Sequence, residues 1–137
     1  MKSYNVVAAV VCDAGEYLCV QRGQTRYGYT AYKYEFPGGK VEQGETEEQA
    51  LLRELLEEMD YPVTIERKLC DLHHEYPDFA VTLHFYLCHP ADTEYPRRFR
   101  LNEHISACWL PACAMSSLPW VAADLPLIEL LQKTSAS

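Results

Sequence analysis

The chain has 137 residues, of which 48% are hydrophobic and 12% aromatic, enough to build the core of one domain spanning residues 1–137. Its 20 acidic and 12 basic residues give a formal net charge of −8, which argues against a nucleic-acid duplex as a partner because phosphate backbones attract basic surfaces. An acidic protein that binds phosphorylated ligands needs cations between its own negative charges and those of the ligand. The composition therefore indicates metal-binding residues.

The cysteines show neither C-x-x-C pairing nor the spacing of zinc ligands: Cys12, Cys19, Cys70, Cys88, Cys108 and Cys113. Their even number is compatible with disulfides, but a chain of this length folds without them. We therefore expect free, mostly buried thiols and a reducing, cytoplasmic location. The apolar run Val6–Val11 is too short to cross a membrane and lacks a cleavage signal, so it is predicted to be a buried strand, with no membrane as partner.

The first elements of the chain are predicted from alternating apolar residues and turn signals. Val6–Cys12 is expected to form a strand and Tyr17–Gln21 its hairpin partner, joined by Asp13-Ala14-Gly15. The polar, tyrosine-rich segment Arg22–Tyr34 has no clear period and is predicted to be a loop. Glu35–Gly39 is expected to be a short strand that runs into a glycine turn.

The rest of the chain is predicted to contain a helix, two strands, a further strand and a last helical segment, over Thr46–Met59, Val63–Glu75, Phe79–His89, Ile105–Leu110 and Leu118–Gln132. A turn at Tyr76-Pro77-Asp78 is expected to join the two strands, and the last helix is expected to begin near Ala122 or Ala123. Because strands dominate and the two helices are far apart in sequence, we predict an α/β fold, an α/β/α sandwich with a mixed sheet between the helices.

The helix predicted at Thr46–Met59 separates apolar from acidic residues. On a helical wheel, an apolar arc of roughly 140° is formed by Leu51, Leu52, Leu55, Leu56 and Met59. Glu54, Glu57 and Glu58 are spaced at i, i+3 and i+4 on the other side, so their carboxylates are expected to converge. Such carboxylates repel unless a cation lies among them, and oxygen ligands suit Mg²⁺, Mn²⁺ or Ca²⁺. Taken alone, the helix is more typical of a solvated acidic face.

The segment before this helix favours the metal-binding alternative. A glycine pair lets the backbone approach a ligand closely, and a helix start favours anions through its free N–H groups. The stretch GGKVEQGETEEQALLRELLEEMDY resembles the Nudix box, G-x5-E-x7-R-E-U-x-E-E-x-G-U, where U is a bulky apolar residue. The matching residues are Gly39, Glu45, Arg53, Glu54, Leu55, Glu57, Glu58 and Tyr61. Asp60 departs from the family's Gly at the helix end, a left-handed position that Asp adopts at modest cost.

The resemblance implies a Nudix fold and a role for each matching residue. It implies that divalent metal, Mg²⁺ with Mn²⁺ as an alternative, is bound by Glu54, Glu57 and Glu58, joined by the Gly38 carbonyl. Arg53 and Glu45 are expected to orient this cluster, and Glu54 is the first candidate for the base that activates water.

The resemblance extends to the MutT-type branch, whose members remove unwanted nucleotides from the cellular pool. In that branch the acid matching Glu103 lies near the metal, while a solvated loop acid is the alternative. Asp124 matches a position that faces the base, where bacterial 8-oxoguanine enzymes carry Asn and CTP pyrophosphohydrolases have a P-A-D-like segment. An ionised Asp124 would only accept hydrogen bonds, which suits a donor edge of guanine or cytosine, but it is equally suited to cap the last helix.

The remaining residues expected to bind substrate are Arg22, Phe36, Lys40 and Phe79, with Phe36 also a candidate for the core. We expect hydrolysis of a nucleoside triphosphate to nucleoside monophosphate and pyrophosphate by a monomer or homodimer. The alternatives are a Nudix hydrolase of a nucleotide sugar or dinucleoside polyphosphate, or a non-catalytic Nudix-like binding module. The five histidines have no trusted metal-ligand spacing and are assigned no role.

Overall fold

The computed structural model describes residues 1–135. Its elements, in chain order, are β1 (Lys2–Asp13), β2 (Glu16–Gln21), β3 (Tyr34–Glu35), β4 (Gly38–Lys40), α1 (Glu47–Met59), β5 (Val63–Glu75), β6 (Phe79–Pro90), β7 (Ser106–Leu110), the 3-10 helices η1 (Ala112–Ser117) and η2 (Ala122–Asp124), and α2 (Leu125–Ser135). The predicted strands and helices are therefore all present. The main differences are a longer β1 and the short strands β3 and β4.

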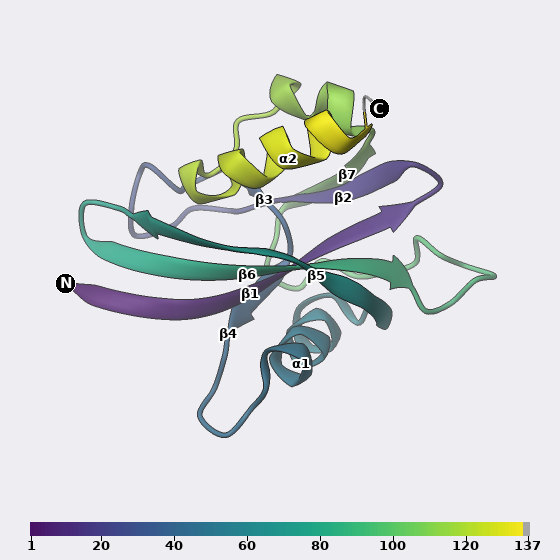
Figure 1. Ribbon diagram of the computed structural model, residues 1–137, viewed down its shortest axis with the longest axis horizontal. Coiled ribbons are helices and arrows are strands. Elements are labelled where there is room, and N and C mark those ends of the chain that lie inside the picture. The colour runs from purple at the N-terminus through teal and green to yellow at the C-terminus, as the bar shows by residue number, and fades with distance from the viewer. Residues whose placement is uncertain (136–137) are drawn as a thin grey trace.

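The strands form one mixed sheet in the order β3-β2-β1-β6-β5, with β4 also paired to β1 and β7 to β2 (Figure 1). β1 and β6 run parallel from the pair Lys2–Phe79 to the pair Val11–Cys88. All other strand pairs are antiparallel, including the long β5–β6 hairpin. The central position of β1 brings the ends of the other strands together around it.

The two α-helices cover opposite faces of this sheet (Figure 1). Because side chains alternate along a strand, β1 supplies both cores: Val7, Ala9 and Val11 pack with α1, whereas Ala8 and Val10 pack with α2. The predicted α/β/α sandwich with a mixed sheet is thus confirmed. None of the helices in residues 1–135 is long and apolar enough to span a membrane, and all six cysteines are free.

Both ends of α1 are defined by local interactions. Thr46 caps the first turn, since its hydroxyl accepts from the Gln49 amide at 3.1 Å and the Gln49 side chain accepts from the Thr46 amide at 3.0 Å. Asp60 ends the helix with φ at 49°, as expected for the residue that replaces the family's glycine. The residues at which α1 begins and ends are therefore fixed by local bonds.

The predicted apolar arc of α1 is too wide. Leu51, Leu55 and Met59 are buried, but Leu52 is 38% exposed and Leu56 is 51% exposed. The sheet contacts only the narrow strip that contains the buried residues, together with Ala50. Leu52 and Leu56 lie beside that strip, so helix periodicity alone overestimates their burial.

The expected glycine turn is a strand. Gly38 and Gly39 belong to β4 and pair with Ala8 and Val7 of β1, and neither has a positive φ. They are needed for close approach: a Cβ on Gly38 would lie 1.9 Å from the Val7 carbonyl oxygen, and one on Gly39 would lie 2.3 Å from the carboxyl carbon of Glu54. The glycine pair therefore brings β4 directly against β1 and against the acidic face of α1.

Candidate active site

A cavity of about 590 Å³ opens between β1, β4, the acidic face of α1, the loop after β2 and the segment before α2. One end is acidic and contains Glu54, Glu58 and Glu103, which we call the cavity cluster. The other end contains aromatic side chains and Asp124. A cavity of this size, acidic at one end and aromatic at the other, suits a ligand with an anionic part and a flat apolar part. Cations at the acidic end would bind the anionic part.

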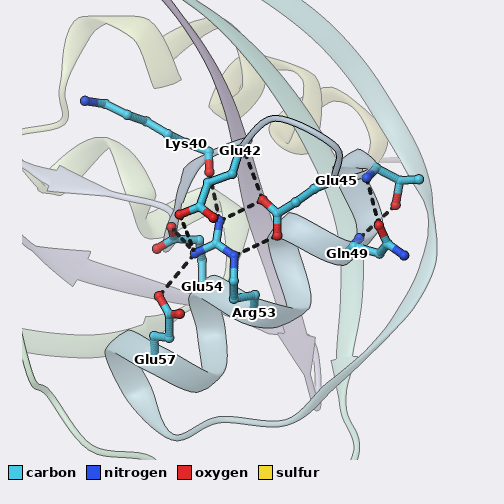
Figure 2. Close-up of polar contacts among 8 residues, drawn as sticks. Lys40, Glu42, Glu45, Gln49, Arg53, Glu54 and Glu57 are labelled. Carbon is cyan, nitrogen blue, oxygen red and sulfur yellow. Dashed lines mark hydrogen bonds and ion pairs between the residues drawn. The ribbon is translucent and has the colours of Figure 1, made fainter.

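Arg53 holds the acidic residues of the loop and helix together (Figure 2). Its Nε donates to Glu45 Oε2 at 2.7 Å and its Nη2 to Glu45 Oε1 at 2.9 Å, a bidentate pair. Its Nη1 donates to Glu54 at 2.9 Å and to Glu57 at 3.1 Å. The Arg53 bonds, with the Glu42 amide, lower the pKa of Glu45 to about 2. The predicted Arg53–Glu45 pair is present, and it fixes the orientation of Glu54.

The cavity cluster brings three carboxyl groups together around Glu58. Burial, reinforced by contacts with the carboxylates of Glu54 and Glu103, raises the pKa of Glu58 far above its usual range. Glu54 is only 13% exposed. A divalent cation with a preference for oxygen ligands would relieve this repulsion, so the residues present fit the metal that the sequence implies. The cluster also explains the glycine at position 39, because any side chain there would displace Glu54.

Glu57 is placed differently from its two neighbours on the helix. Its side chain is 61% exposed, pairs with Arg53 and is not part of the cavity wall. The expected convergence of three helix carboxylates is thus incomplete, since the third carboxylate near Glu54 and Glu58 comes from Glu103 on the loop before β7. The role of Glu57 as a metal ligand stays a prediction.

The apolar end of the cavity is built from rings of distant segments. Phe36 is buried against Trp120, with ring centroids 5.0 Å apart, and also lines the cavity, so it is a core residue whose role in binding substrate stays a prediction. Phe79 packs against Tyr76 at 5.0 Å and Tyr27 at 5.2 Å. Tyr27 and Tyr76 were not predicted; the abundance of tyrosine in the loop after β2 was the only signal for the former.

Asp124 lies at the same end of the cavity and is buried. Its Oδ2 accepts from the Phe36 amide at 3.0 Å, and among the bonds of the described residues no amide of α2 donates to it. Burial, followed by the charge of Glu35, raises its pKa to about 8. The raised pKa favours the protonated carboxylic acid, which both donates and accepts, over the ionised form considered from the sequence. The helix-cap alternative is not supported by the observed bonds.

Arg22 and His104 meet at Glu35 on the wall between the two ends. Arg22 Nη1 lies 3.0 Å from one Glu35 carboxylate oxygen, and His104 Nε2 lies 2.9 Å from the other. Arg22 was predicted to bind substrate and lines the cavity, whereas His104 was assigned no role. His104 lies 69 residues after Glu35, so no local sequence pattern could have identified this contact.

A second group of potential metal ligands lies outside the cavity wall. Glu47 at the start of α1, Asp71 on β5 and His84 on β6 place their ligand atoms within 4.8 Å of one another, and we call them the helix-start cluster. The Lys68 ammonium already contacts two of them, at 2.9 Å from Glu47 and 2.7 Å from Asp71. The Asn5 side chain contacts the other ring nitrogen of His84. The chain itself thus provides the cation for this cluster.

Comparisons with known proteins agree with these features. The NUDIX domain model matches residues 2–131. The chain is 40% identical over 86 residues to the 8-oxo-dGTP diphosphatase of Proteus vulgaris, covering 63% of this chain and 76% of that protein. It is 33% identical over 129 residues to the CTP pyrophosphohydrolase of Escherichia coli, covering 94% and 91%. The solution structure of the E. coli ORF135 protein matches with a TM-score of 0.78 and 30% identity, over 99% of this chain and 93% of that chain.

Proposed function

The chain belongs to the Nudix family of hydrolases, and from this premise we propose that it hydrolyses nucleoside triphosphates to nucleoside monophosphates and pyrophosphate, as a nucleotide-pool sanitising enzyme. The observation that carries the proposal is one cavity that joins the cavity cluster to an aromatic end containing Asp124. Relatives named for 8-oxo-dGTP and for CTP support the reaction class while leaving the base open. Retention of the box glutamates argues against a non-catalytic binding module.

The acidic end is proposed to hold Mg²⁺, or Mn²⁺, through Glu54, Glu58 and Glu103, with Glu57 and the Gly38 carbonyl as further ligands. When bound, such ions neutralise phosphate charge and make a coordinated water more acidic. Glu54 is proposed to accept a proton from the attacking water, because Arg53 holds its carboxylate in a fixed position beside β4. Arg53 and Glu45 then serve to orient this base.

Lys40 is proposed to bind the phosphate chain from the other side. It follows the glycine pair, lines the cavity and places its ammonium 4.1 Å from the centre of the Tyr4 ring. This contact holds a flexible cation over the cavity without using its charge in an ion pair. Because a phosphate chain carries several negative charges, a lysine here adds to the neutralisation that cations at the acidic end provide.

The other end is proposed to bind the nucleoside. Phe36 and Phe79 offer apolar surfaces, while Arg22 and Asp124 offer polar groups. A protonated Asp124 has both a donor and an acceptor, the two capacities of an Asn side chain, so it can pair with a base edge that presents an acceptor next to a donor. This widens the set of bases compatible with Asp124 beyond those with a purely donor edge.

The proposed reaction is tested with a panel of normal and oxidised nucleoside triphosphates, nucleotide sugars and dinucleoside polyphosphates, with products separated by chromatography. We expect nucleoside monophosphate and pyrophosphate from at least one triphosphate, only when Mg²⁺ or Mn²⁺ is present. Cleavage of a nucleotide sugar or dinucleoside polyphosphate with no cleavage of any triphosphate would assign the chain to another branch of the family.

A further inference from the structure

His104 lies in the segment that joins β6 to β7, directly after Glu103. It is 8% exposed, and its Nε2 is 2.9 Å from Glu35 Oε2 on β3. Arg22 donates to the other oxygen of Glu35 at 3.0 Å. Because an ionised carboxylate only accepts hydrogen bonds, Nε2 of His104 carries the proton and donates it. The imidazole thus ties a loop that contains an acidic cavity residue to the sheet.

We propose that His104 is a positioning residue that holds the Glu103 carboxylate against Glu58 and so completes the cavity cluster. The inference rests on the proposed function, since it assigns Glu103 to the metal-binding end of the cavity.

Three further bonds fix the loop on either side of Glu103. On the preceding side, the Arg100 amide donates to the Met59 carbonyl at 2.8 Å and the Asn102 amide to the Glu58 carbonyl at 3.1 Å, which satisfies carbonyls at the end of α1. On the following side, the Ile105 amide donates to the Gln21 carbonyl of β2 at 3.0 Å. These bonds determine the path of the backbone.

The three backbone bonds named above flank residues 103 and 104 and involve neither of them. The His104 side chain attaches this part of the loop, because it is buried in the direction of the sheet while the side chain of the preceding residue lines the cavity. Loss of the imidazole bond would remove this attachment and free Glu103 to move away from Glu58.

The same contact links the two ends of the cavity. The Glu35 carboxylate accepts hydrogen bonds from His104, beside the acidic end, and from Arg22, beside the nucleoside end. Its charge also contributes to the raised pKa of Asp124. A buried side-chain group that fixes a ligand in this way acts as outer-shell partners do in metal sites, where their removal weakens metal affinity.

The test compares the affinity of wild type and variants for Mn²⁺, followed by the electron paramagnetic resonance signal of the free ion, without substrate. We expect His104→Leu to weaken Mn²⁺ binding about tenfold or more. His104→Gln places an amide N–H near the position of Nε2 and should restore most of the affinity, whereas the shorter side chain of His104→Asn should not. His84→Leu is the matched control, because it removes another buried imidazole bonded to a carboxylate, outside the cavity wall.

If His104 only stabilises the fold, the expected results differ. Both leucine variants would then have lower melting temperatures, while the Mn²⁺ affinity of the folded proteins would be unchanged. That result would overturn the inference. In a Glu103→Gln background, His104→Leu should add no further loss, whereas a full additional loss would show that His104 does not act through Glu103. If leucine prevents folding, the Asn and Gln variants carry the comparison. Absence of triphosphate hydrolysis by a wild type that shows these Mn²⁺ effects would refute the proposed function alone.

Discussion

Two clusters of acidic side chains each include residues of α1, and they differ in how far the chain itself compensates their charge. In the helix-start cluster, the Lys68 ammonium and His84 lower the pKa of Asp71 by hydrogen bonding to its carboxylate. In the cavity cluster, the pKa of Glu58 is raised, because burial and two neighbouring carboxylates disfavour its charge. The ligand atoms of the helix-start cluster lie within 4.8 Å of one another, and in the cavity cluster Glu58 contacts both Glu54 and Glu103. In the cavity cluster Arg53 contacts Glu54, and the proposed function adds a divalent cation from solution.

The difference shows that proximity of ligand atoms does not by itself identify a metal site. The helix-start cluster has the more versatile set of ligand types, with one imidazole and two carboxylates. Its charges are nevertheless already compensated within the chain, so a metal ion would have to displace Lys68. The lowered pKa of Asp71 reflects this ammonium, whereas burial is the main cause of the raised pKa of Glu58.

The largest effect is expected from matched substitutions in the two clusters. Glu58→Gln should lower turnover by on the order of a hundredfold or more, because metal placement governs charge stabilisation during phosphoryl transfer. Glu47→Gln, on the same helix but in the helix-start cluster, should leave the turnover of the folded protein near that of wild type. Steady-state rates at saturating Mg²⁺ measure the turnover of both variants and of wild type. Unchanged turnover in EDTA, or equal losses for the two variants, would contradict the assignment.

A second substitution should turn the helix-start cluster into a metal site. Lys68→Met removes the resident ammonium, and the remaining imidazole and carboxylates suit Zn²⁺. Calorimetric titration should then show one more equivalent of Zn²⁺ bound than in wild type, and the double variant Lys68→Met, His84→Leu should lose it. If Lys68→Met binds no additional Zn²⁺, then the ammonium is not what excludes metal from these residues.

A smaller effect is expected from Asp124 at the nucleoside end, which should make the free energy of unfolding depend on pH. Its pKa of about 8 lies above the ordinary value of 3.8, so the folded state binds more protons than the unfolded state between about pH 4 and pH 8. Its contribution to the free energy of unfolding is therefore fully present below pH 4 and is lost as the pH rises through 8. Urea unfolding across this range should show a flatter profile for Asp124→Asn than for wild type. Parallel profiles would mean that Asp124 is ionised throughout.

The smallest effect is expected at the end of α1, away from both sets of ligand atoms. Asp60 has φ at 49°, where glycine is under no steric strain, so Asp60→Gly should stabilise the fold by up to about 1 kcal/mol. Thermal unfolding measures this change, and Mg²⁺-dependent turnover should stay at the wild-type level. A lower melting temperature would show that the Asp60 side chain makes a favourable interaction that outweighs the backbone strain.

Residues related by short, regular spacing could be predicted from the sequence. The contacts of Arg53 with Glu45 and Glu54, and the layers of the fold, follow from helix and strand periodicity together with the family pattern. The exposure of Leu56 could not be predicted, because it depends on how much of α1 the sheet covers. The protonated state of Asp124 depends on burial and on Glu35, and the His104 contact joins residues that are 69 positions apart.

The central claim is that a divalent cation binds the cavity cluster and leaves the helix-start cluster unoccupied in the wild-type protein. It is tested most directly by adding Mn²⁺ to isotopically labelled protein and recording which backbone amide signals the paramagnetic ion broadens. Signals of Gly39, Glu58 and Glu103 should be lost first, while those of Asp71 and His84 persist. Early loss of the Asp71 and His84 signals, with those of the cavity cluster retained, would contradict the account.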